Sequence, residues 1–222
     1  MLPADRVGLV SFADRSYVLA PPTGDHEVVR YFLDALEPGL LPEADRGTRT
    51  LDALQAADDL LERHGSEDAH RIVVVVSDGE SHDEEAGVMS GASALREAGV
   101  RVFAVGVGTR EGAQLMRLDY RGDPVGPLQG PDGEPVVTAL RDSFLRRLAG
   151  RGGGAYLDGT ATPREPARAL LDHLDRTPPD RRRTPDDRRD LPHRLGLIGL
   201  VLLAVESASE AVARRRRREP DG

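Results

Sequence analysis

The chain has 222 residues, a formal net charge of −8 and no cysteine. Its length accommodates one domain with appendages, and its acidic balance argues against a nucleic-acid-binding protein. Without cysteine, disulfide bonds and thiolate metal sites are excluded.

The N-terminal part of the chain predicts a pair of strands followed by two helices. Residues 7–12 form a short apolar run that is typical of a strand, and residues 16–19 can pair back on it. Apolar residues at helical spacing then predict helices over residues 26–36 and 50–62. Thr50 is a suitable N-cap for the second helix.

The rest of the domain alternates between predicted strands and predicted helices. Strands are expected over residues 71–76, 101–107 and 155–157, and helices over residues 86–98, 142–149 and 164–174. This alternation predicts a doubly wound α/β fold, in which a mainly parallel sheet is covered by helices on both faces.

A long segment rich in Gly, Pro and Asp separates two of these elements, between residues 108 and 137. Within it, residues 131–135 (PDGEP) predict the turn of a hairpin. A connection of this length in a compact domain is usually functional or mobile.

Asp78 follows the buried strand 71–76, in the sequence Ser-Asp-Gly-Glu. In open α/β sheets ligands bind just outside the carboxyl ends of the strands, so Asp78 is a candidate binding residue. The alternative is a polar turn, because Asp-Gly is a common turn dipeptide. Further acidic residues, up to Glu85, follow no zinc-ligand spacing and are typical of a solvated helix N-terminus.

The C-terminal part of the chain has a different composition from the domain. A polar linker of Arg, Asp and Pro over residues 176–192 leads to an apolar, uncharged run at 195–205 and then to a basic tail at 214–222. A membrane-spanning helix needs roughly 20 apolar residues, and the longer stretch 193–213 includes Arg194, Glu206 and Glu210. Composition leaves open a transmembrane helix over 193–213, an interfacial helix, or a segment packed on the domain. The arginines of the tail favour a cytoplasmic C-terminus and hence an extracytoplasmic domain.

Three stretches occur together in order, at residues 5–12 (DRVGLVSF), 47–54 (GTRTLDAL) and 76–80 (VSDGE). With further support from residues 99–109 and 130–137, this set resembles a von Willebrand factor A (VWA) domain, in particular the bacterial membrane-anchored aerotolerance (Bat-type) subgroup. The resemblance covers residues 5–158 and implies a VWA domain over 1–175 with a VWA/Rossmann-like fold. That subgroup has its last transmembrane helix where this chain has residues 193–213, which favours the transmembrane interpretation.

The resemblance implies a metal-ion-dependent adhesion site (MIDAS) that holds Mg²⁺ or a similar divalent cation. Thr48 matches the loop threonine of the family, which is a hydroxyl ligand, and Asp78 matches its later aspartate, which acts directly or through water. The Asp-x-Ser-x-Ser motif of the family's first strand is absent, so this central strand is expected to be missing. Either the chain is N-terminally incomplete, which we favour, or the domain has lost its metal site. We therefore predict weak or no Mg²⁺ binding by this chain alone.

The function that the resemblance implies is that of a non-enzymatic, membrane-tethered protein–protein interaction module. Its expected partners are other VWA-type membrane proteins and a MoxR-type AAA+ ATPase, in envelope stress or complex assembly. Two alternatives stay open. One is a hydrolase or nucleotide-dependent enzyme on a doubly wound sheet, for which the sequence shows neither a nucleophile motif nor a phosphate loop. The other is a metal-free structural scaffold.

Overall fold

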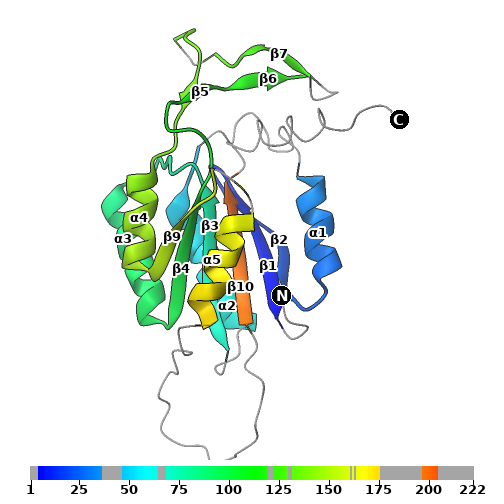
Figure 1. Cartoon of the computed structure of the whole chain (residues 1–222), viewed down its shortest axis with the longest axis vertical. Coiled ribbons are helices and arrows are strands. Elements are labelled where there is room, and N and C mark those ends of the chain that lie inside the picture. The colour runs from blue at the N-terminus through cyan, green and yellow to red at the C-terminus, as the bar shows by residue number, and fades with distance from the viewer. Residues whose placement is uncertain are drawn as a thin grey trace, which may run out of the picture.

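The computed structural model describes residues 5–36, 47–64, 69–119, 123–129, 132–160, 162, 164–175 and 197–204. A six-stranded sheet in the order β2-β1-β10-β3-β4-β9 forms its centre (Figure 1). Five strands run parallel, and β2 pairs antiparallel with β1, as residues 7–19 predicted. The strand bounds are β1 (Arg6–Phe12), β2 (Ser16–Thr23), β3 (His70–Ser77), β4 (Val100–Gly106), β9 (Gly153–Asp158) and β10 (Leu197–Ala204).

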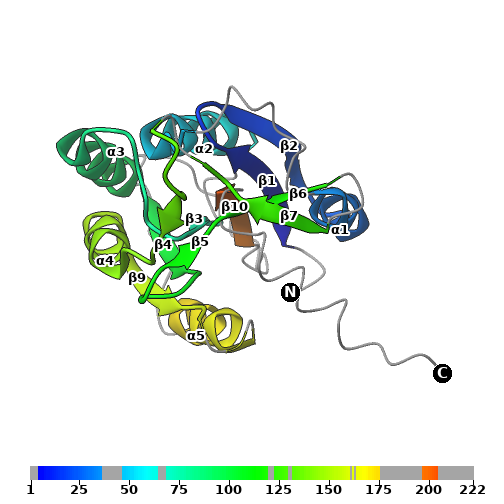
Figure 2. The ribbon, with the colours of Figure 1, turned by 90° about the horizontal axis from the view of Figure 1, so that it is seen from above.

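Helices cover both faces of the sheet (Figure 2). Val73 and Val75 of β3 pack in the core cluster that includes residues of α2, α3 and α4, whereas Ile72 and Val74 pack in a second cluster with Leu174 of α5. Successive side chains of a strand point to opposite faces, so the continuous valine run supplies both cores. The doubly wound fold is thereby confirmed. The helices are α1 (His26–Ala35), α2 (Thr50–His64), α3 (Glu85–Glu97), α4 (Asp142–Arg151) and α5 (Arg164–Asp175).

The central position of the sheet is filled in a way that the sequence did not predict. No described strand precedes β1, yet β10 lies between β1 and β3 and pairs with both in parallel. Where we expected a hydrophobic helix over residues 193–213, the structure has a strand over Leu197–Ala204. The physical reason is that β1 and β3 each have a ladder edge to satisfy, and an extended segment of eight residues matches their length.

No helix among the described residues has both the length and the apolar character needed to cross a membrane. Residues 193–196 and 205–213 of the expected transmembrane segment lie outside the described residues. The same is true of the linker 176–192 and the basic tail 214–222.

The long Gly/Pro/Asp segment folds into two small two-stranded sheets, which we call the arm. The arm consists of β5 (Ala113–Gln114), β6 (Met116–Leu118), β7 (Pro124–Pro127) and β8 (Val137–Thr138), where β5 pairs with β8 and β6 pairs with β7. Figure 1 shows β5, β6 and β7 beyond the carboxyl ends of the central strands. The predicted turn lies at Gly133, which has a φ of +81°, and a bridge joins Gln129 to Pro135.

Candidate functional site

Both residues that the resemblance selected lie at the carboxyl edge of the sheet and are buried. Asp78 directly follows β3, and Thr48 lies two residues before α2. Two hydrogen bonds join their loops: the Thr48 N–H donates to His82 Nδ1 (2.9 Å), and the His82 N–H donates to the Thr48 carbonyl oxygen (2.9 Å). The fold thus connects two loops that are about 30 residues apart in the sequence.

The Asp78 carboxylate is held in one orientation by groups from both sides. Its Oδ1 accepts a hydrogen bond from the Glu80 N–H (3.0 Å), and its Oδ2 accepts one from the Thr138 hydroxyl (2.6 Å). The Asp78 carbonyl oxygen also accepts the N–H of Arg141, the residue before α4 (2.6 Å). Sequence reasoning missed Thr138, because it is 60 residues away from Asp78 and belongs to β8 of the arm.

Gly79 makes the turn after Asp78 possible. It has a φ of +84°, and a Cβ atom at this position would lie 2.6 Å from the Arg141 carbonyl oxygen. Only glycine adopts that backbone conformation without strain. The Asp-Gly pair is therefore a turn, as the alternative interpretation had it, and the turn also presents a buried carboxylate.

The acidic residues after Asp78 are engaged in local structure. Asp83 Oδ2 accepts the N–H of Leu51 (2.8 Å) and so caps the start of α2, where Thr50 is the first helical residue rather than the N-cap. Glu80 and Glu85 form ion pairs with Arg141 (2.9 Å) and Arg147 (2.6 Å), which lie next to or on α4. Glu85 lies in the first turn of α3, as expected for an acidic helix N-terminus.

The oxygen atoms of Thr48 and Asp78 are suitable ligands for a hard cation, but these two residues make a small ligand set. Mg²⁺ prefers six oxygen ligands and usually keeps several waters. Thr48 contributes a hydroxyl and Asp78 a carboxylate whose two oxygens already accept hydrogen bonds. In the part of the chain that the structure describes, no group of three or more His, Cys, Asp or Glu could hold a metal ion. The described residues therefore fit part of a Mg²⁺ site, and their role as ligands stays a prediction.

A second polar cluster lies at the end of β9 and was not predicted. Asp158 accepts hydrogen bonds from the hydroxyl (2.6 Å) and N–H (2.9 Å) of Thr160 and from Arg110 (2.8 Å). The Thr160 hydroxyl and the Arg110 guanidinium hold the pKa of Asp158 far below its usual range. Arg110 also lies 3.6 Å from Asp142 of α4. These ion pairs connect β9, α4 and the chain after β4, and we assign the cluster a structural role.

Tyr156 lies next to this cluster. Its ring is covered by the Arg146 guanidinium, 4.2 Å from the ring centroid. Its hydroxyl is buried and finds no hydrogen-bond partner among the described residues. Burial raises the pKa of this hydroxyl, followed in importance by the charge of Asp158.

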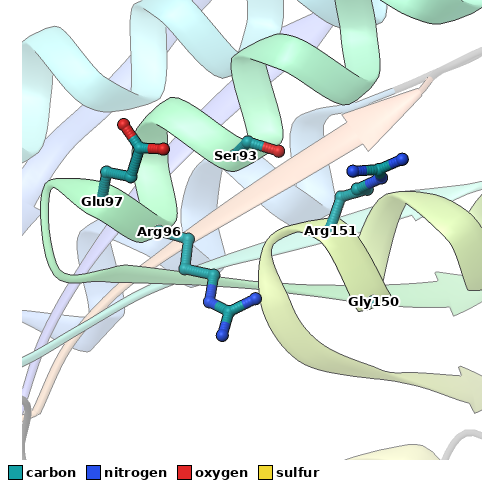
Figure 3. Close-up of a pocket in the computed structure, with 5 residues that line it drawn as sticks. All are labelled: Ser93, Arg96, Glu97, Gly150 and Arg151. Atoms are coloured by element: carbon teal, nitrogen blue, oxygen red, sulfur yellow. The ribbon is translucent and has the colours of Figure 1, made fainter.

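A shallow depression of about 300 Å³ lies between the last turns of α3 and α4 (Figure 3). These helices end just before β4 and β9 begin, so the depression is at the amino edge of the sheet, opposite Asp78. Its lining residues are Ser93, Arg96, Glu97, Gly150 and Arg151. It does not contribute to the candidate site.

A doubly wound sheet with a loop aspartate and a loop threonine at its carboxyl edge defines a Rossmann-like binding domain. The von Willebrand factor type A domain family matches residues 3–126, more than half of the chain, and the chain belongs to this family.

Two similar solved structures support the Bat-type resemblance. BatB from Bacteroides thetaiotaomicron is 26% identical, with a TM-score of 0.69, and the match covers 78% of this chain and 80% of that one. An aerotolerance-related membrane protein from Bacteroides fragilis is 25% identical, with a TM-score of 0.65 and the same coverage. The chain is thus similar to aerotolerance-related bacterial VWA proteins.

A relative found by sequence similarity is an animal protein rather than a bacterial one. The mouse collagen alpha-4(VI) chain is 36% identical over 150 residues, which cover 65% of this chain and only 6% of the collagen chain. The present chain therefore spans a small part of that relative. Together the relatives place the domain among those of the adhesion and protein-interaction type.

Proposed function

We propose that the protein is a non-enzymatic interaction module that binds a partner protein at the carboxyl edge of its sheet. The observation that carries this proposal is the buried Asp78 carboxylate, whose orientation is fixed by the Glu80 N–H and the Thr138 hydroxyl. A buried carboxylate held both within its own turn and by the Thr138 hydroxyl of β8 is a preorganised group rather than a solvated turn residue. Domains of this family are in general interaction modules, which supports the same assignment.

The arm supplies a surface for the partner beside Asp78. Its base carries Thr138, which contacts Asp78 directly. Three large apolar side chains of the arm are exposed, at Met116, Val125 and Val137. Because the arm carries these side chains and also contacts Asp78, partner binding would cover the arm and the carboxyl edge together.

Metal dependence is a further part of the proposal. Thr48 and Asp78 would supply a hydroxyl and a carboxylate to Mg²⁺ or a similar divalent cation, and an acidic group of the partner would complete the ligand shell. Because the described set is small, we expect the chain alone to bind Mg²⁺ weakly or not at all. Calorimetry with Mg²⁺ tests this, and a stoichiometric site of micromolar affinity would contradict it.

The proposed partners are a MoxR-type AAA+ ATPase and other VWA-type membrane proteins, in envelope stress or complex assembly. The support is the similarity to aerotolerance-related proteins. The test measures binding of the MoxR-type ATPase from the same organism to the full chain, with Mg²⁺ present. Asp78→Asn should weaken binding at least tenfold, about 1.4 kcal/mol. Glu97→Gln, at the opposite edge, is the matched control, and equal affinities of the two variants would refute the proposal.

The proposed location is the cell membrane, with the domain on the extracytoplasmic side. The Bacteroides fragilis relative is described as a membrane protein, which supports this location. Residues 197–204 cannot pair as β10 and cross a bilayer at the same time, so a single-pass anchor over 193–213 would require the sheet to release β10. Alkaline carbonate extraction of membranes from expressing cells tests this: an anchored chain stays in the pellet, and a chain that is not anchored is released.

A further inference from the structure

The β6–β7 hairpin of the arm has two faces of different character. Successive side chains of a strand point to opposite faces, and residues paired across an antiparallel ladder share a face. Met116 pairs with Pro127, and Arg117 pairs with Gly126. Met116, Val125 and Pro127 therefore lie on one face, and Arg117 lies on the other. We call the first of these the apolar face.

The apolar face is open to solvent. Met116 is 41% exposed and Val125 is 51% exposed, although both side chains are large and apolar. Figure 1 shows the hairpin beyond the carboxyl ends of the central strands. The outer edge of β7 is poorly suited to pairing with a further strand, because Pro124 and Pro127 have no N–H group to donate. The apolar face, rather than that edge, is therefore the surface that a partner can use.

The arm also carries negative charge that its own residues leave uncompensated. Residues 111–138 contain five acidic residues and two arginines. Asp123 and Glu134 are exposed, and within the described part of the chain neither forms an ion pair, whereas Glu80 has an arginine partner. Arg117, the arginine of the arm that the structure describes, lies on the face opposite the apolar one.

The hairpin fixes the position of one of these carboxylates. The Asp119 N–H donates to the Asp123 carbonyl oxygen (2.9 Å), and the Asp123 N–H donates to Asp119 Oδ1 (2.9 Å). Asp123 lies two residues before Val125, so its charge is held near the apolar face. A group that is already in place loses less conformational entropy when a partner engages it.

We propose that the apolar face of the arm binds a partner segment that carries arginine or lysine next to apolar side chains. This inference rests on the proposed function, because it names the chemistry of the partner surface that meets the arm. The apolar side chains of the segment would cover Met116 and Val125, as in the apolar centre of an interface, and its cations would lie against Asp123 at the polar rim. Complementary charge speeds association, and like charge suppresses wrong partners.

Two synthetic peptides test the proposal. In the first, valine alternates with arginine, and in the second, valine alternates with glutamate. Fluorescence anisotropy measures the binding of each labelled peptide to the full chain, without added Mg²⁺. The arginine peptide should bind at least about tenfold more tightly than the glutamate peptide. Its affinity should fall as salt is raised, because salt screens exposed charges. Equal binding of the two peptides, or no binding of either, would overturn the proposal.

Substitutions show whether the peptide binds at the arm. Asp123→Asn should weaken binding of the arginine peptide about threefold, as expected for an exposed ion pair. Glu97→Gln changes the net charge equally at the opposite edge of the sheet and should leave the affinity unchanged. Val125→Ser should also weaken binding about threefold or more, whereas Leu171→Ser, on α5 and 48% exposed, should not. The proposal is overturned if either arm variant behaves like its control. Met116→Ser repeats the test if Val125→Ser fails to fold.

The peptide experiment can fail separately from the proposal for Asp78. The arginine peptide has no acidic side chain and no Mg²⁺ is added, so its binding does not require Asp78 to act as a metal ligand. If Asp78→Asn weakens ATPase binding while the arm variants leave peptide binding unchanged, the Asp78 proposal holds and this inference is refuted. If the arm variants weaken peptide binding while Asp78→Asn leaves ATPase binding unchanged, this inference holds and the Asp78 proposal is refuted.

Discussion

Replacing Gly79 with alanine is the most direct test of how the Asp78 loop is built. Gly79 has a φ of +84°, where an L-residue pays about 1–2 kcal/mol. The new methyl group would lie 2.6 Å from the Arg141 carbonyl oxygen and 3.1 Å from Leu145 Cγ. Relief of this overlap requires the loop to move away from α4.

Gly133→Ala provides the matched control. Gly133 has nearly the same φ, +81°, but a Cβ atom there meets nothing within 4 Å. The Gly133→Ala substitution lowers the unfolding free energy only through backbone strain. This loss is offset by about 0.4–1 kcal/mol, because alanine reduces the entropy of the unfolded chain. The net destabilisation at Gly133 should therefore be about 0.5–1 kcal/mol.

The Gly79→Ala variant should lose more unfolding free energy than Gly133→Ala, because overpacking against α4 adds about 1–3 kcal/mol of destabilisation. Movement of the loop also weakens the hydrogen bond from the Arg141 N–H to the Asp78 carbonyl oxygen, worth about 1 kcal/mol. We expect a total destabilisation of about 2.5–5 kcal/mol, equivalent to a fall in Tm of about 5–20 °C for a protein of this size.

Urea unfolding of both variants, followed by circular dichroism, measures the difference. The slope of unfolding free energy against urea should stay unchanged, so that the midpoints report stability alone. If Gly79→Ala and Gly133→Ala have unfolding free energies within about 0.5 kcal/mol of each other, the conclusion that the Asp78 loop packs closely against α4 is wrong.

Three further predictions test other parts of the structure. Leu200→Pro removes a ladder N–H from a central strand and leaves a buried acceptor unpaired, so it should lower the unfolding free energy by at least about 1–3 kcal/mol; an unchanged urea midpoint would place the segment outside the sheet. Tyr156→Phe removes a buried hydroxyl without a partner among the described residues, so thermal unfolding should show equal or slightly higher stability, and a marked loss would reveal a partner. His70→Gln should flatten the fall of stability on acidification, which urea titrations at about pH 7 and pH 5 compare.

The sign of the His70 effect follows from its lowered pKa. Burial, and then the nearby charge of Arg101, favour the neutral imidazole in the folded state. As the pH falls through the ordinary value near 6.5, the unfolded chain takes up the proton first. Stability contributed by neutral His70 is thus present above that pH and lost below it. If the unfolding free energy falls by the same amount between about pH 7 and pH 5 in wild type and in His70→Gln, His70 contributes nothing to the pH dependence of stability.

The local sequence determined most of the elements and the position of one site residue. The valine run of β3 predicted a strand buried on both faces, and the Asp-Gly pair predicted a turn at its carboxyl end. Both are local properties, set by side-chain periodicity and by the steric freedom of glycine. The structure agrees with both predictions: Val73 is buried in the core, and Gly79 makes the turn with a φ of +84°.

Only the tertiary structure decided what Asp78 contacts and which strand fills the centre of the sheet. Thr138 comes from the arm, 60 residues away, and no local pattern couples it to Asp78. The apolar run at 195–205 is compatible with a helix or a strand, because apolar side chains suit either conformation. Its pairing as β10 depends on the unsatisfied ladder edges of β1 and β3, which exist only once those strands lie on either side of it.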